Sequence, residues 1–153
     1  MKHGNYGPGN TDFKKLQVSK FPLTLWDGVA YGHCGCGATA LALITGKNPL
    51  DIADKNGRRH YSDRFMVDFL RKHGVSVFEV NRANLTRSKK WQHQLGDNNV
   101  VLYSAHTAKG ESSYFVTFCG YLYHNFSISK ANYLDFLNFP IDSCYVLFKK
   151  SWK

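Results

Sequence analysis

The stretch "GHCGCGATALALITGKNP", residues 32–49, decides how this chain is expected to fold. Its second half, from Ala38 to Thr45, consists of good helix formers, and Gly46 follows at the position where helices commonly end with glycine. The run is apolar on every face, so we expect a central, buried helix. Two cysteines, Cys34 and Cys36, stand among glycines just before it.

The position of Cys36 at the start of this helix is typical of a nucleophile. A thiol attacks as the thiolate, and a helix N-terminus favours that form through its N–H groups and the positive end of its dipole. The flanking glycines, Gly35 and Gly37, would let the backbone or acyl group of a substrate approach the sulfur. N–H groups of the first turn would then stabilise an oxyanion, and a base with an orienting partner would complete the site.

Two more helices are predicted after this stretch. Asn48 followed by Pro49 is an N-cap with proline at the first helical position, and it opens a short helix over PLDIADKNG. Ser62 caps a third helix over DRFMVDFLRKHG, which Gly74 closes. This helix has an apolar stripe at helical spacing, formed by Phe65, Met66, Phe69 and Leu70.

Beyond residue 75 the apolar residues recur with a period of two, which indicates strands. The predicted elements are a strand from Val75 to Val80, a polar helix from Asn84 to Leu95, a strand from Val100 to Ser104, a hairpin in SSYFVTFCGYLYHNFSI that turns at Cys119-Gly120, and a last strand in CYVLFKK. A short strand is also expected between Leu16 and Trp26. Helices that precede the strands predict an α+β fold, with helices packed on one antiparallel sheet.

The composition fits one globular domain. The chain has 153 residues, of which 43% are hydrophobic, and this is enough for one continuous core. We expect a flexible arm over residues 1–12 and a single domain over residues 13–153. No apolar window is long enough to cross a bilayer, and the N-terminus has no secretory hydrophobic block, so a cytoplasmic or virion-borne protein without membrane contact is expected.

The four cysteines, Cys34, Cys36, Cys119 and Cys144, are expected to be reduced, because nothing marks this as a secreted, disulfide-bonded domain. A bridge between Cys34 and Cys36 would also be strained. Zinc is not expected, since the Cys-x-Cys spacing is unusual for a zinc site and no second close pair of ligands follows. We therefore expect no metal and no other cofactor.

The net charge of +9 makes attraction to nucleic acid or to acidic surfaces plausible. The basic residues are spread along the chain in blocks no longer than two, which favours a solvated basic face over a dedicated nucleic-acid site. Aromatic residues in a basic setting, such as Trp91 beside Lys89 and Lys90, would stack on single strands. They more often cover a core.

The segment "CGATALALITGK", which begins at Cys36, resembles the nucleophile segment of papain-like cysteine peptidases. It is similar to the bacteriocin-processing group, which shows Cys-Gly-Pro-Thr-Ala-Leu-Ala-Met at this place, and to small papain-like phage proteins. The similarity extends loosely from Gly32 to Phe126. It implies a papain-like fold, a protein or peptide substrate, a viral origin, and Cys36 rather than Cys34 as nucleophile of a peptidase, deamidase or acyl-transfer enzyme. The family places a glutamine of the oxyanion hole about six residues before the nucleophile, where this chain has Ala30, so His33, Asp27 or backbone amides would have to substitute.

The resemblance also implies a histidine base at the start of the first hairpin strand and an Asp or Asn on the second. Ser113 and Tyr114 occupy the first position here, while the second strand offers His124 and Asn125. Three alternatives stay open. His124 acts as the base from across the hairpin with Asn125 orienting it, His106 acts from the preceding loop, or the chain is an inactive papain-like fold that serves as a small basic binding or virion-associated protein.

Overall fold

The structure is a computed structural model of the chain, and it describes residues 14–16, 23–27, 31–57, 59–80, 99–106, 112–119, 121–124, 127–129 and 141–152. Of residues 14–16, 25–27, 31–33, 106, 124 and 127–129 it describes the backbone alone. The arm predicted over residues 1–12 and the polar helix predicted from Asn84 to Leu95 lie outside the described residues.

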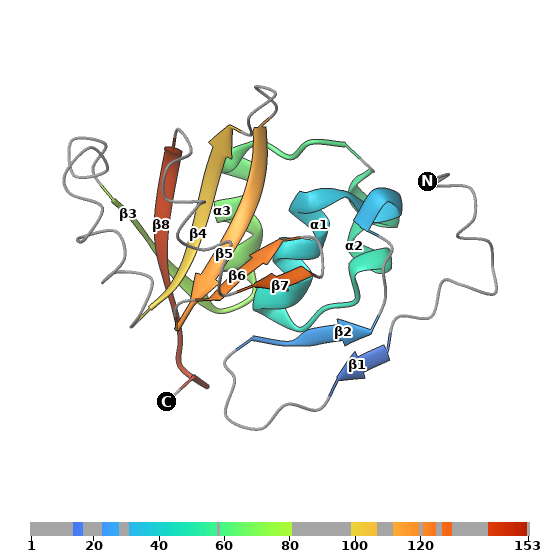
Figure 1. Cartoon of the computed structure of the whole chain (residues 1–153), viewed down its shortest axis with the longest axis horizontal. Helices are drawn as coiled ribbons and strands as arrows, with labels where there is room; N and C mark the ends of the chain where they lie inside the picture. The colour runs from blue at the N-terminus through green and yellow to red at the C-terminus, as the bar shows by residue number, and fades with distance from the viewer. Residues whose placement is uncertain are drawn as a thin grey trace.

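An antiparallel sheet of six strands forms one layer of the fold (Figure 1). The strand order is β3 (Val75–Glu79), β8 (Ile141–Lys149), β4 (Val100–His106), β5 (Ser112–Phe118), β6 (Tyr121–His124) and β7 (Ser127–Ser129). A separate antiparallel pair consists of β1 (Lys14–Leu16) and β2 (Leu25–Asp27), where one short strand was expected. The C-terminal strand β8 lies between β3 and β4, so the sheet depends on pairing between distant parts of the sequence.

The described residues form three helices, which make the other layer: α1 (Tyr31–Thr45), α2 (Pro49–Asn56) and α3 (Asp63–Lys72). Figure 1 shows α1 between the sheet and α2, and α3 packs against α1 and β3. Six consecutive residues of α1, from Gly37 to Ala42, are buried. The predicted α+β fold and the buried central helix are therefore confirmed.

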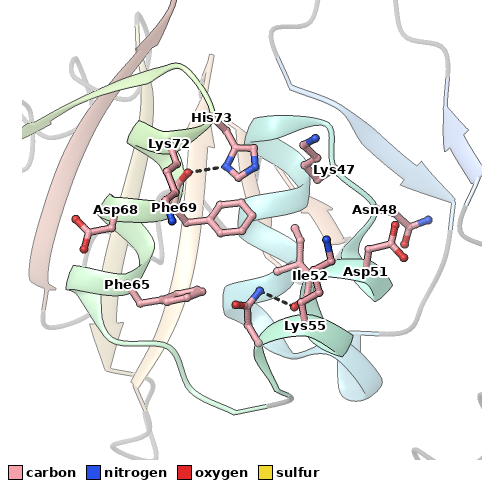
Figure 2. A pocket seen from close by; sticks show the side chains of 11 residues that line it. Lys47, Asn48, Asp51, Ile52, Lys55, Phe65, Asp68, Phe69, Lys72 and His73 are labelled. Carbon is pink, nitrogen blue, oxygen red and sulfur yellow. Dashed lines mark hydrogen bonds between the residues drawn. The ribbon is translucent and has the colours of Figure 1, made fainter.

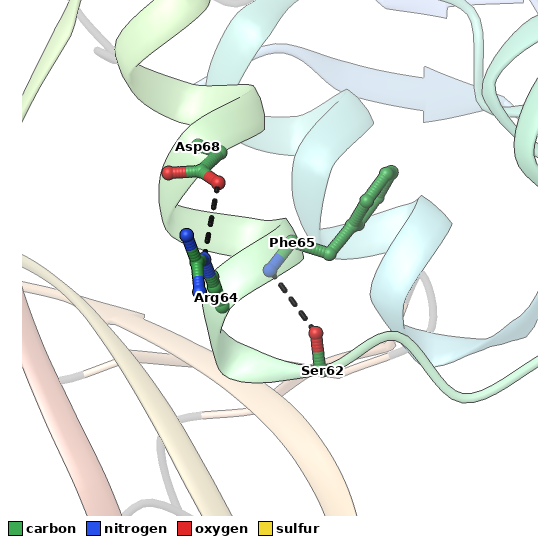
Figure 3. A network of polar contacts seen from close by, with 4 residues as sticks. All are labelled: Ser62, Arg64, Phe65 and Asp68. Carbon is green, nitrogen blue, oxygen red and sulfur yellow. Dashed lines mark hydrogen bonds and ion pairs between the residues drawn. The ribbon is translucent and has the colours of Figure 1, made fainter.

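The predicted capping residues lie at the starts and ends of the helices, as expected from the sequence. The N–H of Gly46 donates to the Ala42 carbonyl at 3.0 Å, and the Asn48 side chain accepts from the Leu50 N–H at 2.8 Å. Ser62 Oγ accepts from the Phe65 N–H at 3.1 Å at the start of α3 (Figure 3). Gly74 follows α3 with a φ of 81°. Local sequence therefore fixes these boundaries through hydrogen bonds to otherwise unpaired backbone groups.

The two faces of the sheet are buried in different clusters. Alternate sheet residues pack with the helices: Leu102, Tyr114, Val116, Tyr123, Tyr145 and Leu147. Residues of the opposite parity form a second cluster: Val101, Tyr103, Ala105, Phe115, Leu122 and Cys144. Because successive strand side chains point to opposite faces, this division defines a helix-side face and an outer face. Burial also raises the pKa of the Cys144 thiol to about 12, as expected for a packing residue.

The β5–β6 hairpin turns where the sequence predicted. Phe118 pairs with Tyr121, and the ladder continues to Val116 opposite Tyr123, which is the register that a two-residue turn at positions 119 and 120 requires. Cys119 adopts a φ of 52° in the turn. A third strand, β7, was not predicted and pairs with β6, with Ser127 opposite His124.

Candidate functional site

A kink at Gly35 sets the position of Cys36. The helix was expected to begin near Cys36, but helical turns are already present from Tyr31. Gly35 interrupts them with φ 88° and ψ 161°, a conformation essentially restricted to glycine. Cys36 is therefore the first residue of the helical segment that continues to Thr45.

The two neighbouring cysteines differ in exposure. Cys34 is fully buried, whereas Cys36 is half-buried and borders the helix-side core. Both are thiols, since no disulfide joins any of the four cysteines. Of the two, only Cys36 is accessible to solvent, and access is one condition for a reactive thiol.

The two glycines around Cys36 have different roles. Among the residues that the structure describes, no heavy atom lies within 4 Å of the Cβ position of Gly35, so none of them fills the space beside the kink. A Cβ on Gly37 would instead lie 2.8 Å from Cδ2 of Tyr61. We expected Gly37 to let a substrate approach the sulfur. It is instead buried, and its lack of a side chain lets α1 pack against the Tyr61 ring.

Tyr114 on β5 interacts electrostatically with the Cys36 thiolate. Burial raises the pKa of its phenol, and the Asp63 carboxylate and a Cys36 thiolate raise it further. Its hydroxyl lies 2.6 Å from the Tyr61 carbonyl oxygen and 2.8 Å from Asp63 Oδ1. Tyr114 therefore stays neutral and fixed beside Cys36, at a position where the family resemblance implied a histidine.

Asp63 connects the start of α3 to two strands of the sheet. Its Oδ1 lies near the Tyr114 hydroxyl on β5, and its Oδ2 accepts from the Tyr145 hydroxyl on β8 at 3.1 Å. A carboxylate in the first turn of a helix is also stabilised by the helix dipole. This network holds the wall of the site that carries Tyr114.

The same network predicts a loss of stability at alkaline pH. Burial, followed by the Asp63 charge, raises the pKa of Tyr145 from 10.0 to about 12. The neutral phenol thus contributes stability that is complete below pH 10 and is lost as the pH rises towards 12. The slope is at most about 1.4 kcal/mol per pH unit for one group. Urea unfolding from about pH 9 to pH 11 should show a steeper decline for the natural protein than for Tyr145→Phe; equal slopes would contradict the assignment.

His60 is a candidate that the sequence did not reveal as part of the site. Its exposed ring stacks on the Tyr114 ring with centroids 5.3 Å apart and planes 7° from parallel. Tyr114 belongs to the helix-side core cluster against which Cys36 packs, so His60 stacks on a residue of the cluster that borders the thiol. No sequence pattern links residues 60 and 114, so only the packing of the α2–α3 loop on β5 could identify it.

For three of the other predicted site residues the structure describes only the backbone, and it does not describe the fourth. His33 lies within α1, two residues before the kink. His106 ends β4 opposite Ser112, and His124 ends β6 opposite Ser127. Their side chains, and the whole of Asn125, lie outside the described residues.

The comparisons with known proteins add no family assignment. No family model, no curated protein and no solved structure matches this chain. Within the described ranges, none of the helices combines the length and apolar character needed to span a bilayer.

Proposed function

We propose that this protein is a papain-like cysteine hydrolase with Cys36 as its nucleophile. The supporting observation is the Gly35 kink, which makes a half-buried cysteine the first residue of a buried helical segment. This is the setting that favours a thiolate and supplies N–H groups for an oxyanion. Protein or peptide carbonyl groups are the proposed substrate class.

The proposed reaction proceeds through a thioester. The histidine base takes the proton of the Cys36 thiol, and the resulting thiolate attacks a carbonyl carbon while N–H groups of the first helical turn hold the developing oxyanion. The carbon–nitrogen bond then breaks, and the leaving amine takes a proton from the histidine base. Water attacks the thioester carbonyl and gives a proton to the same histidine, and the thiolate departs from the acid product.

Strand alternation favours His106 over His124 as the base. Position 106 lies two residues after Ser104 on β4, so the two share a face of the sheet. It pairs with Ser112, which shares the helix-side face with Tyr114 on β5. Position 124 has the parity of Leu122, which packs in the outer cluster. Cys36 borders the helix-side core, so His106 is the better placed of the two, and His60 joins it as a second candidate.

The test is the alkylation of Cys36 by iodoacetamide as a function of pH, resolved by mass spectrometry of the tryptic peptides. We expect Cys36 to react rapidly well below the free-thiol pKa of about 8.5, and one of the variants His60→Ala, His106→Ala and His124→Ala to lose this plateau. The exposed Cys119 of the same chain serves as the internal control. Its rate should follow an ordinary thiol in every variant.

The hydrolase would be contradicted if the alkylation rate of Cys36 had the same pH dependence as that of Cys119 and if none of the three histidine substitutions changed it. The inactive papain-like binding protein would then be the better proposal. Tyr114 is the observation that favours it, because a phenol already held by Asp63 and the Tyr61 carbonyl occupies the place where the resemblance implies a base.

A further inference from the structure

A groove of about 560 Å³ lies between α2 and α3, and the hydrolase does not use it (Figure 2). Ile52, Phe65 and Phe69 provide apolar surface, and Figure 2 shows both phenyl rings directed into the groove. Its volume falls in the range of small-ligand pockets. The groove therefore offers enclosed apolar area outside the neighbourhood of Cys36.

The aromatic surface belongs to a continuous row of rings. Tyr61, Phe65, Phe69 and His73 recur at every fourth residue, with successive centroids 4.6, 6.0 and 4.3 Å apart. His73 is fixed in the row because its Nδ1 lies 2.8 Å from the Phe69 carbonyl oxygen. Phe65, Phe69 and His73 are only half-buried, so the row is accessible from the groove.

Cations surround this row. Lys47, Lys55 and Lys72 line the groove, and none of the three forms an ion pair with a described carboxylate. Two carboxylates also line it, but Asp68 pairs with Arg64 at 3.9 Å and Figure 2 shows it pointing away from the rings. Asp51 lies in the first turn of α2, where the helix dipole stabilises it.

We infer that this groove binds single-stranded nucleic acid, with bases against Phe65 and Phe69 and phosphates on Lys47, Lys55 and Lys72. Aromatic rings stack on any base, and lysines neutralise the backbone, which is how sequence-tolerant single-strand sites work. An acidic peptide would satisfy the lysines but has no flat rings for the aromatic row. The net charge of +9 supports association with a polyanion.

The test measures binding of a fluorescein-labelled oligothymidylate of about 12 nucleotides by anisotropy at several salt concentrations. Lys47→Gln/Lys72→Gln should weaken binding about tenfold and reduce the salt slope by about 1.4, the value for two lost phosphate contacts. The matched control Lys149→Gln/Lys150→Gln removes the same charge from the end of β8, at two lysines that do not line the groove. Its affinity should change by less than about threefold.

A second variant tests the aromatic row without removing charge. Phe69→Leu keeps an apolar side chain at this half-buried position and should weaken binding by about tenfold, because base stacking is lost. The alkylation rate of Cys36 in each variant reports whether the fold is intact. Three results would each overturn the inference. The two double lysine variants could lose the same affinity, Phe69→Leu could leave the affinity unchanged, or polyglutamate at equal charge could displace the oligonucleotide.

Discussion

Replacing Asp63 by alanine is expected to lower the free energy of unfolding by about 2–4 kcal/mol, since hydrogen bonds to a charged group contribute about 1.5–3 kcal/mol each. The carboxylate accepts from the Tyr145 hydroxyl at 3.1 Å and lies 2.8 Å from the Tyr114 hydroxyl. Without it Tyr145 loses this partner, whereas Tyr114 keeps the Tyr61 carbonyl. The first turn of α3 also loses its acidic residue.

Urea unfolding at neutral pH measures this effect, with Asp68→Ala as the matched control on the same helix. Asp68 makes an exposed pair with Arg64 at 3.9 Å, so its removal should cost less than about 0.5 kcal/mol. Asp63→Asn keeps an oxygen acceptor and should recover part of the stability. Equal losses for Asp63→Ala and Asp68→Ala would show that the two-tyrosine network does not stabilise the fold.

Gly35→Ala is expected to cost about 1–3 kcal/mol of stability, because φ 88° and ψ 161° lie in a region that residues with a Cβ rarely adopt. No atom of the described residues lies within 4 Å of the added methyl group, so we assign the cost to the backbone conformation. The kink relaxes towards helix to relieve it, and Cys36 moves. Alkylation of Cys36 should slow by a factor on the order of ten or more.

Gly57→Ala is the matched control. Gly57 has nearly the same conformation, with φ 89° and ψ 155°, but it ends α2 at an exposed position. Its added Cβ would meet only ordinary contacts with Arg59 at 3.8 Å. We expect a similar loss of stability and no change at Cys36. If both variants leave the Cys36 rate unaltered, the kink does not position the nucleophile.

Much of the fold could be predicted because short-range hydrogen bonds determine it. Asn48, Ser62 and Gly46 mark helix ends through bonds to residues two to four positions away. The β5–β6 register followed from a tight turn at Cys119-Gly120. The start of α1 was predicted too late, because the turns before Gly35 lack the apolar pattern that marks the rest of the helix.

Of the candidate site, the sequence pointed to Cys36 alone among the residues that the structure describes near it, and its role as nucleophile stays a prediction. Cys36 stands out because glycines and a helix start lie next to it in the sequence. Gly37 was misread as open to substrate, since its contact with Tyr61 joins two elements that are distant along the chain. His60 was missed for the same reason, as its stacking partner Tyr114 is 54 residues away.

The sequence by itself determined the α+β class, the helix ends and Cys36 as the reactive candidate, because these depend on periodicity and on neighbours within one turn. Only the tertiary structure decided that β8 inserts between β3 and β4, that Asp63 joins Tyr114 to Tyr145, and that four rings form one row. These contacts depend on which faces meet when the layers pack. Hydrophobic burial selects that arrangement for the whole chain at once, so no local pattern records it.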